Sequence, residues 1–270
     1  MTVDSGLKKV FFMGCKQVAT ECFQLLLNLH ISGKVIIVGA LSSPHKLDGA
    51  DNVTSLCAEY KIPILSSLES FLDFKEVDIL ISVQFGEILK RVHLEKAREI
   101  NVNLHMAPLP EYRGCNQFSH ALLDGKDYFG TTLHVIDEQI DHGDILFEKR
   151  FPIPEGAWVE ELYSLTVSES VSLFRESIKD LIVGKYTRTP QAELLDKRGT
   201  SLHLRREMEM LKLIDLTKGT EHIYSILRAT SMPGFPPPFA ELNGEKVYLV
   251  AERYALSPHR LLCCPDNNLS

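Results

Sequence analysis

The first half of the chain alternates between short apolar segments and longer segments with apolar residues at helical spacing. The nearly all-apolar run at 35–41 is typical of a strand buried on both faces, as in a parallel sheet. After Gly14, apolar residues at every third or fourth position predict a helix. This alternation predicts a doubly wound, mostly parallel α/β sheet. The predicted strands lie at 9–14, 35–41, 62–65, 77–83 and 100–104, with a second helix at 53–60.

The same alternation continues after the fifth predicted strand. Gly184 stands where a C-cap glycine would end a long helix. We therefore assign residues 1–190 to one α/β domain. The elements predicted in its second part are a helix at 117–123, strands at 131–136 and 145–151, and a long helix within 158–183.

The last part of the chain has mixed polar sequence with clustered charges. Apolar spacing predicts one helix at 220–229, and the Asn243-Gly244 pair between alternating stretches predicts a two-residue β-hairpin. We assign residues 191–256 to a small C-terminal α+β domain that ends in this hairpin. The segment 257–270 has no periodicity, so we expect a disordered tail there.

Composition narrows the class of protein. A formal net charge of −7 argues against a nucleic-acid partner, because such proteins usually carry a basic surface. No apolar run is long enough for a membrane span, and the start lacks a signal-peptide pattern, so we expect a cytoplasmic globular protein. The six cysteines are scattered without a Cys-x-x-Cys pair, and we expect Cys22 and Cys57 to be small core residues.

Candidate chemistry lies at the end of the fifth predicted strand. Asn103 and His105 are two residues apart, so both side chains point to the same side of the sheet, at the edge where open parallel sheets bind ligands. An amide and an imidazole are donors that suit a carbonyl oxygen gaining negative charge. Asp141, in an acidic loop after the strand that ends at Ile136, is the candidate to hold the imidazolium charge or accept a proton. Taken alone, these patterns also fit a turn, a buried histidine and a solvated loop.

Two segments around these residues resemble a known family. The run Asn103-Leu-His-Met-Ala-Pro-Leu-Pro-Glu-Tyr-Arg-Gly114 resembles the signature of the folate-dependent formyltransferases, and Ile140-Asp-His-Gly-Asp-Ile-Leu146 is similar to the family's second motif. Order and spacing match, and the resemblance covers residues 9–182. It implies that Asn103 and His105 stabilise the formyl oxygen, that Asp141 positions the histidine and a water, and that an amine attacks 10-formyltetrahydrofolate directly.

The resemblance also implies a folate pocket built largely from the backbone of two loops. Apolar Ile88 and Leu89 suit a flat pterin ring, although the first loop by itself also fits a plain strand-to-helix connection. The residues implied are Phe85, Gly86, Glu87, Ile88 and Leu89 in the first loop, and Ile136, Asp137, Glu138 and Asp141 in the second.

The acceptor is suggested by a shorter motif. The run Arg113-Gly-Cys-Asn116-Gln117 resembles the nucleotide-sugar N-formyltransferases, and the short C-terminal part is less basic than in the members that act on tRNA. The implied acceptor is a nucleotide-linked amino sugar, such as a dTDP- or UDP-4-amino-4,6-dideoxyhexose. Arg113, Asn116 and Gln117 are the candidates to contact the sugar. Candidates for the diphosphate are Lys16, Arg205, Arg206 and Arg228, although each also fits a solvated surface residue. Tyr224 could stack on the base, but its apolar neighbours on the predicted helix favour a core position.

Other functions stay open at this point. Methionyl-tRNA or glycinamide ribonucleotide is the alternative acceptor, and a folate or nucleotide-sugar binding module without turnover is the non-enzymatic alternative. A metal hydrolase would use His105, His120, His134 or His142 with nearby aspartates, but no His-x-His or His-x-x-x-His spacing occurs and we expect no metal. The free edge of the predicted hairpin suggests a homodimer.

Overall fold

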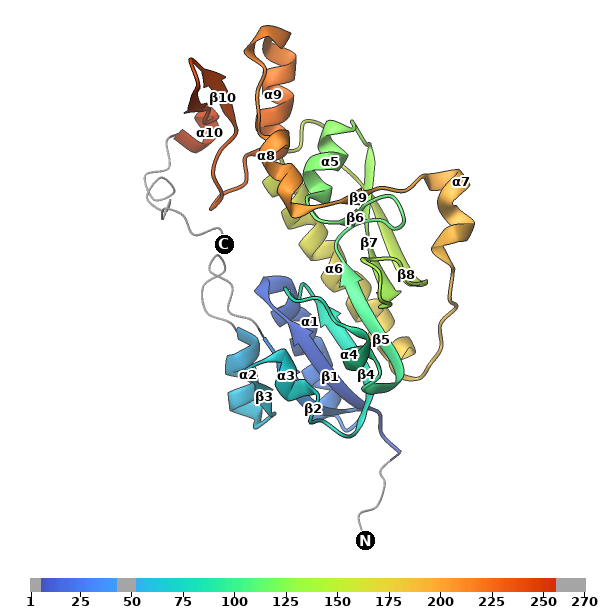
Figure 1. Ribbon diagram of the computed structural model, residues 1–270. Coiled ribbons are helices and arrows are strands. Elements are labelled where there is room, and N and C mark those ends of the chain that lie inside the picture. Colours follow the sequence, from blue (N-terminus) through green and yellow to red (C-terminus); the bar gives the residue numbers. More distant parts are fainter. Residues whose placement is uncertain (1–5, 43–51, 256–270) are drawn as a thin grey trace. The chain divides into compact units, whose positions relative to one another are not determined.

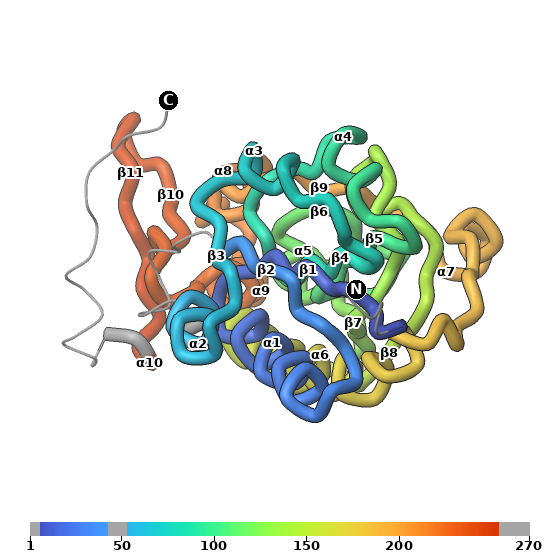
Figure 2. Tube along the Cα trace, turned by 90° about the horizontal axis from the view of Figure 1, so that it is seen from below, coloured from blue at the N-terminus to red at the C-terminus, as the bar shows by residue number. Residues whose placement is uncertain are grey.

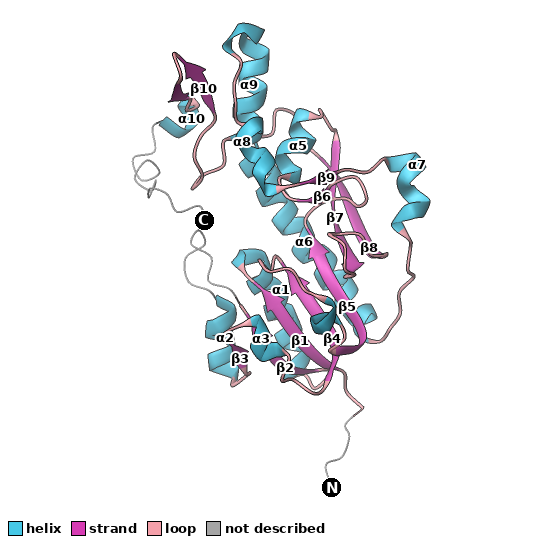
Figure 3. Ribbon diagram, viewed as in Figure 1, coloured by secondary structure: helices cyan, strands magenta, loops and turns pink. Residues whose placement is uncertain are grey.

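The computed structural model describes residues 6–42 and 52–255, and a seven-stranded mixed sheet runs through it (Figure 3). The strand order is β3-β2-β1-β4-β5-β7-β8, with parallel pairing from β3 to β5 and antiparallel pairing between β5 and β7. The strands are β1 (Lys9–Gly14), β2 (Ile36–Leu41), β3 (Ile64–Leu65), β4 (Val77–Val83), β5 (Ala97–His105), β7 (Tyr128–Val135) and β8 (Ile145–Pro152). The predicted α/β class with its mostly parallel sheet is confirmed.

Helices cover both faces of the parallel part of the sheet. Helices α1 and α6 lie on one face, and α3 and α4 lie on the other (Figures 1 and 2). The apolar stripe predicted after Gly14 is the buried side of α1. The helices up to residue 182 are α1 (Lys16–Ile31), α2 (Asn52–Tyr60), α3 (Leu68–Phe71), α4 (Arg91–Leu94), α5 (Gln117–Leu123) and α6 (Val159–Ile182).

The core on the α3 and α4 face is built from strand residues and short helices. Phe11 of β1 packs against Phe71 of α3, with ring centroids 4.6 Å apart. Gly39 of β2 makes room for this contact, because a Cβ there would lie 2.8 Å from the Phe11 ring. Cys22 and Cys57 are fully buried, as expected. These contacts pack the helices closely against the sheet, in which β4 separates β1 from β5, the strand that carries the candidate chemistry.

Short elements follow α6, and the predicted hairpin lies near the end of the described residues. Asn243 and Gly244 both have positive φ, as a type I′ turn requires. The elements are η1 (Gln191–Leu194), α7 (Leu195–Arg198), β9 (Leu202–His203), which pairs with β6 (Arg113–Gly114), η2 (Arg205–Glu207), α8 (Met208–Leu211), η3 (Leu216–Lys218), α9 (Gly219–Thr230), β10 (Phe239–Leu242), β11 (Glu245–Tyr248) and α10 (Glu252–Ala255).

The chain divides into two compact units, each made of several segments. The first unit comprises Met1–Arg113, Gly130–Arg150 and Thr166–Ser201, and the second comprises Gly114–Phe129, Phe151–Leu165 and Leu202–Ser270. A division after residue 190 into folding domains stays a prediction, and the expected tail at 257–270 lies outside the described residues. Within the described part, no helix combines the length and apolarity that crossing a membrane requires.

The second unit has a small apolar core of its own. Helix α9 packs against α5, and Ile226 of α9 is buried with Ile214 and Ala240. Tyr224 on the same helix is exposed and lies edge-on to Trp158, with centroids 5.6 Å apart, so the expectation that it belongs to the core is wrong. Tyr224 follows Ile223, which packs on this core, and successive residues of a helix point in different directions, so the Tyr224 side chain lies outside the apolar stripe.

Candidate active site

The strand β5 carries Asn103 and His105 at its carboxyl end, between two different neighbours. On one side β4 runs parallel and pairs Ser82 with Asn103. On the other side β7 runs antiparallel and pairs Asn103 with His134. The antiparallel neighbour therefore adds a second imidazole beside the predicted amide.

His105 is buried and held in one orientation by the loop that follows it. Its Nε2 donates to the backbone oxygen of Tyr112 at 2.7 Å, since a carbonyl only accepts. The Tyr112 amide in turn donates to the backbone oxygen of Pro108, which closes the turn. His105 Nδ1 then faces Asp141 Oδ2 at 3.5 Å. A proton on Nδ1 would make the ring an imidazolium paired with the carboxylate.

His134 is oriented in the same way and faces the same carboxylate. Its Nδ1 donates to the backbone oxygen of Val135 at 2.8 Å, so in the neutral ring Nε2 is an acceptor. That Nε2 lies 3.2 Å from Asn103 Nδ2 and 3.5 Å from Asp141 Oδ1. The two imidazole planes stand at 88° to one another. We call Asn103, His105, His134 and Asp141 the Asp141 cluster.

The loop that carries Asp141 approaches β7 more closely than a side chain would permit. A Cβ at Gly143 would lie 2.1 Å from the backbone oxygen of Val135. The amide of Val135 also donates to the backbone oxygen of Asp144 at 2.9 Å. Glycine at position 143 therefore allows the close packing that sets the Asp141 carboxylate against both imidazoles.

Gln191 fixes the same loop from a distant part of the sequence. Its buried amide donates to the backbone oxygens of Asp141 and Gly143 at 2.9 and 2.8 Å, and its Oε1 accepts from Arg113 Nε at 3.1 Å. Sequence reasoning did not assign Gln191 or His134 to the formyl-transfer site, although it named His134 as a candidate ligand of the alternative metal site. No local signal marks them, because strand register and a long-range contact bring them to the cluster.

The two loops implied to hold folate meet on one apolar cluster. Phe85 and Ile136 pack against a buried group that includes Leu89. Leu89 is thus a core residue, which corrects the interpretation that its side chain faces a pterin ring, whereas Ile88 is 73% exposed. The positive φ of Gln84 makes a sharp turn after β4.

The polar residues of these loops have partners in the first unit. Asp137 Oδ2 accepts from His142 Nδ1 at 2.6 Å, and Glu138 lies 3.9 Å from Arg91. Gly86 and Glu87 are exposed. Lys16 Nζ donates to Gln84 Oε1 at 3.3 Å, so the candidate diphosphate ligand already contacts the first loop.

The candidate sugar-binding residues fall in both units. Arg113 belongs to the first unit, where Gln191 holds its guanidinium. Asn116 and Gln117 belong to the second unit, where Asn116 Nδ2 donates to the backbone oxygen of Leu204 at 3.0 Å. Gln117 is 8% exposed. These two side chains have structural roles at the start of α5, and a contact with a sugar stays a prediction.

The sequence matches the model of the Formyl transferase family over residues 42–178, slightly more than half of the chain. The chain belongs to the formyl transferase family. The family that the sequence motifs indicated is therefore confirmed. The prediction that the protein is an enzyme, a formyltransferase, is confirmed as well. The match includes Asn103, His105, His134 and Asp141.

Relatives of this chain include two kinds of formyltransferase. A methionyl-tRNA formyltransferase of Listeria monocytogenes is 27% identical over 239 residues, which is 83% of this chain and 73% of the relative. The Helicobacter canadensis N-formyltransferase, solved with folinic acid and dTDP-3-aminofucose, superposes with a TM-score of 0.70 at 23% identity, covering 89% of this chain and 86% of the other. A 4-N formyltransferase from Francisella tularensis gives 0.73 at 20% identity, with 91% and 97% covered.

Proposed function

We propose that this formyltransferase transfers the formyl group of 10-formyltetrahydrofolate to the amine of a nucleotide-linked amino sugar. The observation that carries the chemistry is the Asp141 cluster, in which one partly buried carboxylate faces two oriented imidazoles beside an amide donor. Neither serine nor cysteine belongs to this cluster, which supports direct attack by the amine over a covalent enzyme intermediate.

The proposed reaction begins when the unprotonated amine of the acceptor attacks the formyl carbon. The carbonyl oxygen becomes an oxyanion, which accepts from the amide of Asn103 and from His105 Nδ1. Nδ1 is the donor because Nε2 is held by the Tyr112 backbone oxygen. Asn103 has two amide hydrogens, so one stays on His134 while the other reaches the oxyanion.

Collapse of the tetrahedral intermediate completes the proposed transfer. The attacking nitrogen, now positively charged, gives a proton to Asp141 directly or through a water. The bond between the formyl carbon and N10 of the folate breaks, and N10 receives a proton along the same route. The Asp141 carboxylate balances the His105 imidazolium until it takes the proton of the attacking nitrogen, and it is regenerated when N10 is protonated. No net charge is left on the enzyme.

The folate site is proposed at the two loops that share the Leu89 cluster. The residues assigned to it are Phe85, Gly86, Glu87, Ile88 and Leu89, and Ile136, Asp137, Glu138 and Asp141, with Leu89 contributing backbone rather than side chain. The first loop follows β4, whose Ser82 pairs with Asn103, and the second loop carries Asp141 itself, which supports this assignment. Two similar structures were solved with folates, one with folinic acid and one with 5-N-formyl-THF.

The sugar acceptor is supported by the structural neighbours and by the Arg113 motif. Two of those neighbours contain dTDP or a dTDP-linked amino sugar, and both cover 89% of this chain. Lys16, Arg113, Asn116 and Gln117 are the proposed acceptor contacts. Methionyl-tRNA is the second candidate, because the methionyl-tRNA formyltransferase of Listeria monocytogenes is 27% identical over 83% of this chain.

A substrate screen tests both steps of the proposal. The full chain is incubated with 10-formyltetrahydrofolate and, in separate reactions, with dTDP- or UDP-linked amino sugars, glycinamide ribonucleotide and methionyl-tRNA. We expect tetrahydrofolate to appear with one amino-sugar nucleotide and not with the other acceptors. The His105→Ala variant, purified in parallel, controls for contaminating activity. Transfer only to tRNA would overturn the sugar acceptor, and no transfer to any acceptor would overturn the formyl chemistry.

A homodimer through the C-terminal hairpin is proposed as the oligomeric state. Val247 and Tyr248 of β11 are both exposed, on the edge strand of a two-stranded sheet. An exposed apolar strand edge is a surface that proteins commonly cover. Sedimentation should give the mass of a dimer for the chain, and a monomer for the Val247→Lys/Tyr248→Lys variant.

A further inference from the structure

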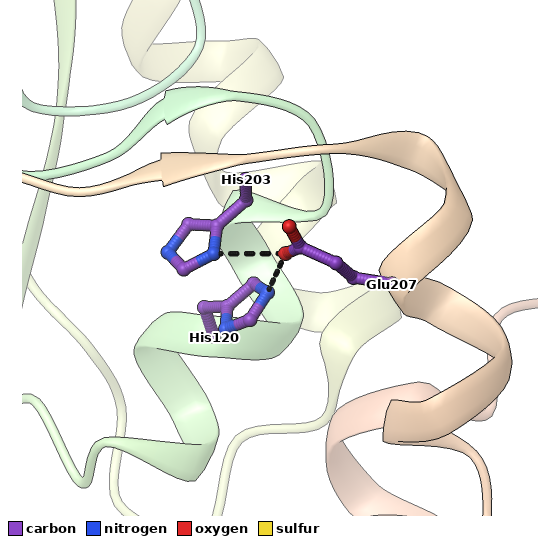
Figure 4. A group of neighbouring side chains, drawn as sticks. All are labelled: His120, His203 and Glu207. Atoms are coloured by element: carbon purple, nitrogen blue, oxygen red, sulfur yellow. Dashed lines mark hydrogen bonds and ion pairs between the residues drawn. The ribbon is translucent and has the colours of Figure 1, made fainter.

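Three side chains of the second unit form a compact group that the formyl-transfer chemistry does not use (Figure 4). They are His120 of α5, His203 of β9 and Glu207 of η2, and we call them the Glu207 cluster. Glu207 Oε2 lies 3.2 Å from His203 Nδ1 and 3.6 Å from His120 Nε2. All three ligand atoms lie within 4.8 Å of one another.

The backbone around the Glu207 cluster is held closely in place. The amide of Cys115 donates to the backbone oxygen of His203 at 2.9 Å, and Asn116 Nδ2 donates to that of Leu204. Gly114 makes this approach possible, since it has a φ of +83° and a Cβ there would lie 2.2 Å from the His203 oxygen. The two histidines therefore start from fixed main-chain positions, which lowers the entropy lost when a ligand is bound.

The two imidazoles and the carboxylate lie close together. The imidazoles are stacked, with centroids 3.4 Å apart and planes at 16°. His120 Nε2 is buried, and its 3.6 Å contact with Glu207 Oε2 is longer than a hydrogen bond. A buried ring nitrogen without a hydrogen bond, next to a carboxylate, suits a metal ligand.

We propose that His120, His203 and Glu207 bind a divalent transition-metal ion, with zinc the best match. Two nitrogen ligands and one carboxylate form a donor set that zinc uses, with a water or another oxygen ligand in the fourth position. Tetrahedral zinc with bonds of about 2.0–2.1 Å places its ligand atoms about 3.3 Å apart. The two measured contacts of Glu207 Oε2 lie on either side of that value. On binding, one imidazole turns out of the stack so that both ring nitrogens point at the ion.

This inference departs from the expectation that the protein holds no metal. His203 and Glu207 are four residues apart, but they are not the pair of histidines that the His-x-His and His-x-x-x-His patterns require. His120 lies in a different segment and reaches the pair through the packing of β6 against β9. The inference is independent of the proposed acceptor and of the formyl chemistry.

Metal binding by the purified full chain is the test. After removal of any affinity tag and treatment with a chelator, the protein is titrated with Zn²⁺ in competition with a chromophoric chelator. We expect one equivalent to bind, with Mg²⁺ unable to compete because it prefers an all-oxygen octahedral site. Replacing zinc by Co²⁺ should give the visible spectrum of a four-coordinate ion.

Variants assign the bound ion to these residues. His120→Gln and Glu207→Gln keep side-chain size and should each weaken zinc binding at least about tenfold, because even supporting residues of metal sites contribute that much. His222→Gln removes another histidine of the second unit and should bind like the unmodified chain. Cys263→Ser/Cys264→Ser removes adjacent thiols that could hold zinc by themselves, and it should also leave the affinity unchanged.

Each result decides the proposal. The proposal is overturned if the unmodified chain binds no zinc. It is also overturned if His120→Gln and Glu207→Gln bind zinc as tightly as the unmodified chain, or if only the double cysteine variant loses zinc. Circular dichroism and the melting temperature show whether each variant folds. If either variant fails to fold, the other variant and the cobalt spectrum of the unmodified chain still decide, because a chain without this site gives only the weak spectrum of hydrated Co²⁺.

Discussion

The Asp141 and Glu207 clusters each bring two imidazoles to one carboxylate, yet they differ in how the rings are held. In the Asp141 cluster each imidazole donates one N–H to a backbone oxygen, and the planes stand at 88°. In the Glu207 cluster the rings are stacked at 16°, and Glu207 accepts from His203. The first carboxylate is 15% exposed and the second 35%.

The difference shows that residue types alone do not decide the chemistry of a cluster. A ring with one nitrogen fixed on a carbonyl has a defined tautomer and one remaining polar atom, which suits proton transfer and oxyanion stabilisation. A ring whose buried nitrogen makes no hydrogen bond suits a metal ligand, because an imidazole nitrogen binds metal ions readily. The variants below separate these two roles.

The largest effect is expected from removing the polar groups of the Asp141 cluster. Asn103→Ala, His105→Ala and Asp141→Ala should each lower kcat of formyl transfer by at least about two orders of magnitude, the scale of lost oxyanion or acid–base groups. The rate is measured with the acceptor that the screen identifies. Asn28→Ala, at an exposed position on α1, is the control and should retain full activity. Near-normal turnover in any of the three would remove that residue from the mechanism.

A smaller loss is expected from moving the Asp141 carboxylate without removing it. Gly143→Ala places a Cβ against the Val135 oxygen, so the loop must shift away from β7. We expect kcat to fall between about tenfold and about a hundredfold, because displacements near 1 Å have such effects. Gly184→Ala is the control, since its positive φ strains the backbone where no atom lies within 4 Å. A rate loss shared by both variants would indicate general destabilisation instead.

The corresponding glycine of the other cluster should affect stability and metal binding. Gly114→Ala forces a Cβ onto the His203 oxygen at a positive φ, which should lower the free energy of unfolding by about 2 kcal/mol. Urea unfolding measures this change, and zinc affinity should fall with it. A variant with an unchanged unfolding midpoint and unchanged zinc affinity would show that the Gly114 contact does not support the Glu207 cluster.

The smallest effect is expected from the residue that supports the Asp141 loop from outside it. Gln191→Leu leaves the buried oxygens of Asp141 and Gly143 without their donor. We expect kcat to fall about tenfold, equal to roughly 1.4 kcal/mol. A positioning role also predicts that the pH profile of kcat changes, because the contact between Asp141 and His105 loosens. Gln17→Leu, exposed on α1, should change neither quantity.

Local sequence patterns determined the longer helices and strands of the α/β sheet, and they also identified the family. Strands β1 and β4 and helix α5 begin and end where apolar spacing predicts, because each period depends only on neighbouring residues. Strand β5 starts earlier than predicted, since pairing with β4 extends it through charged residues that carry no strand signal. Asn103, His105 and Asp141 were identified because they lie in two contiguous motifs.

Only the tertiary structure decided which distant groups complete each cluster. His134 faces Asn103 through the register of β7 on β5, and Gln191 reaches the Asp141 loop from beyond the predicted domain boundary. The pairing of β6 with β9 sets His120 against His203. Strand register and the contacts between remote segments follow from packing of the whole core, because no short stretch of sequence contains both partners.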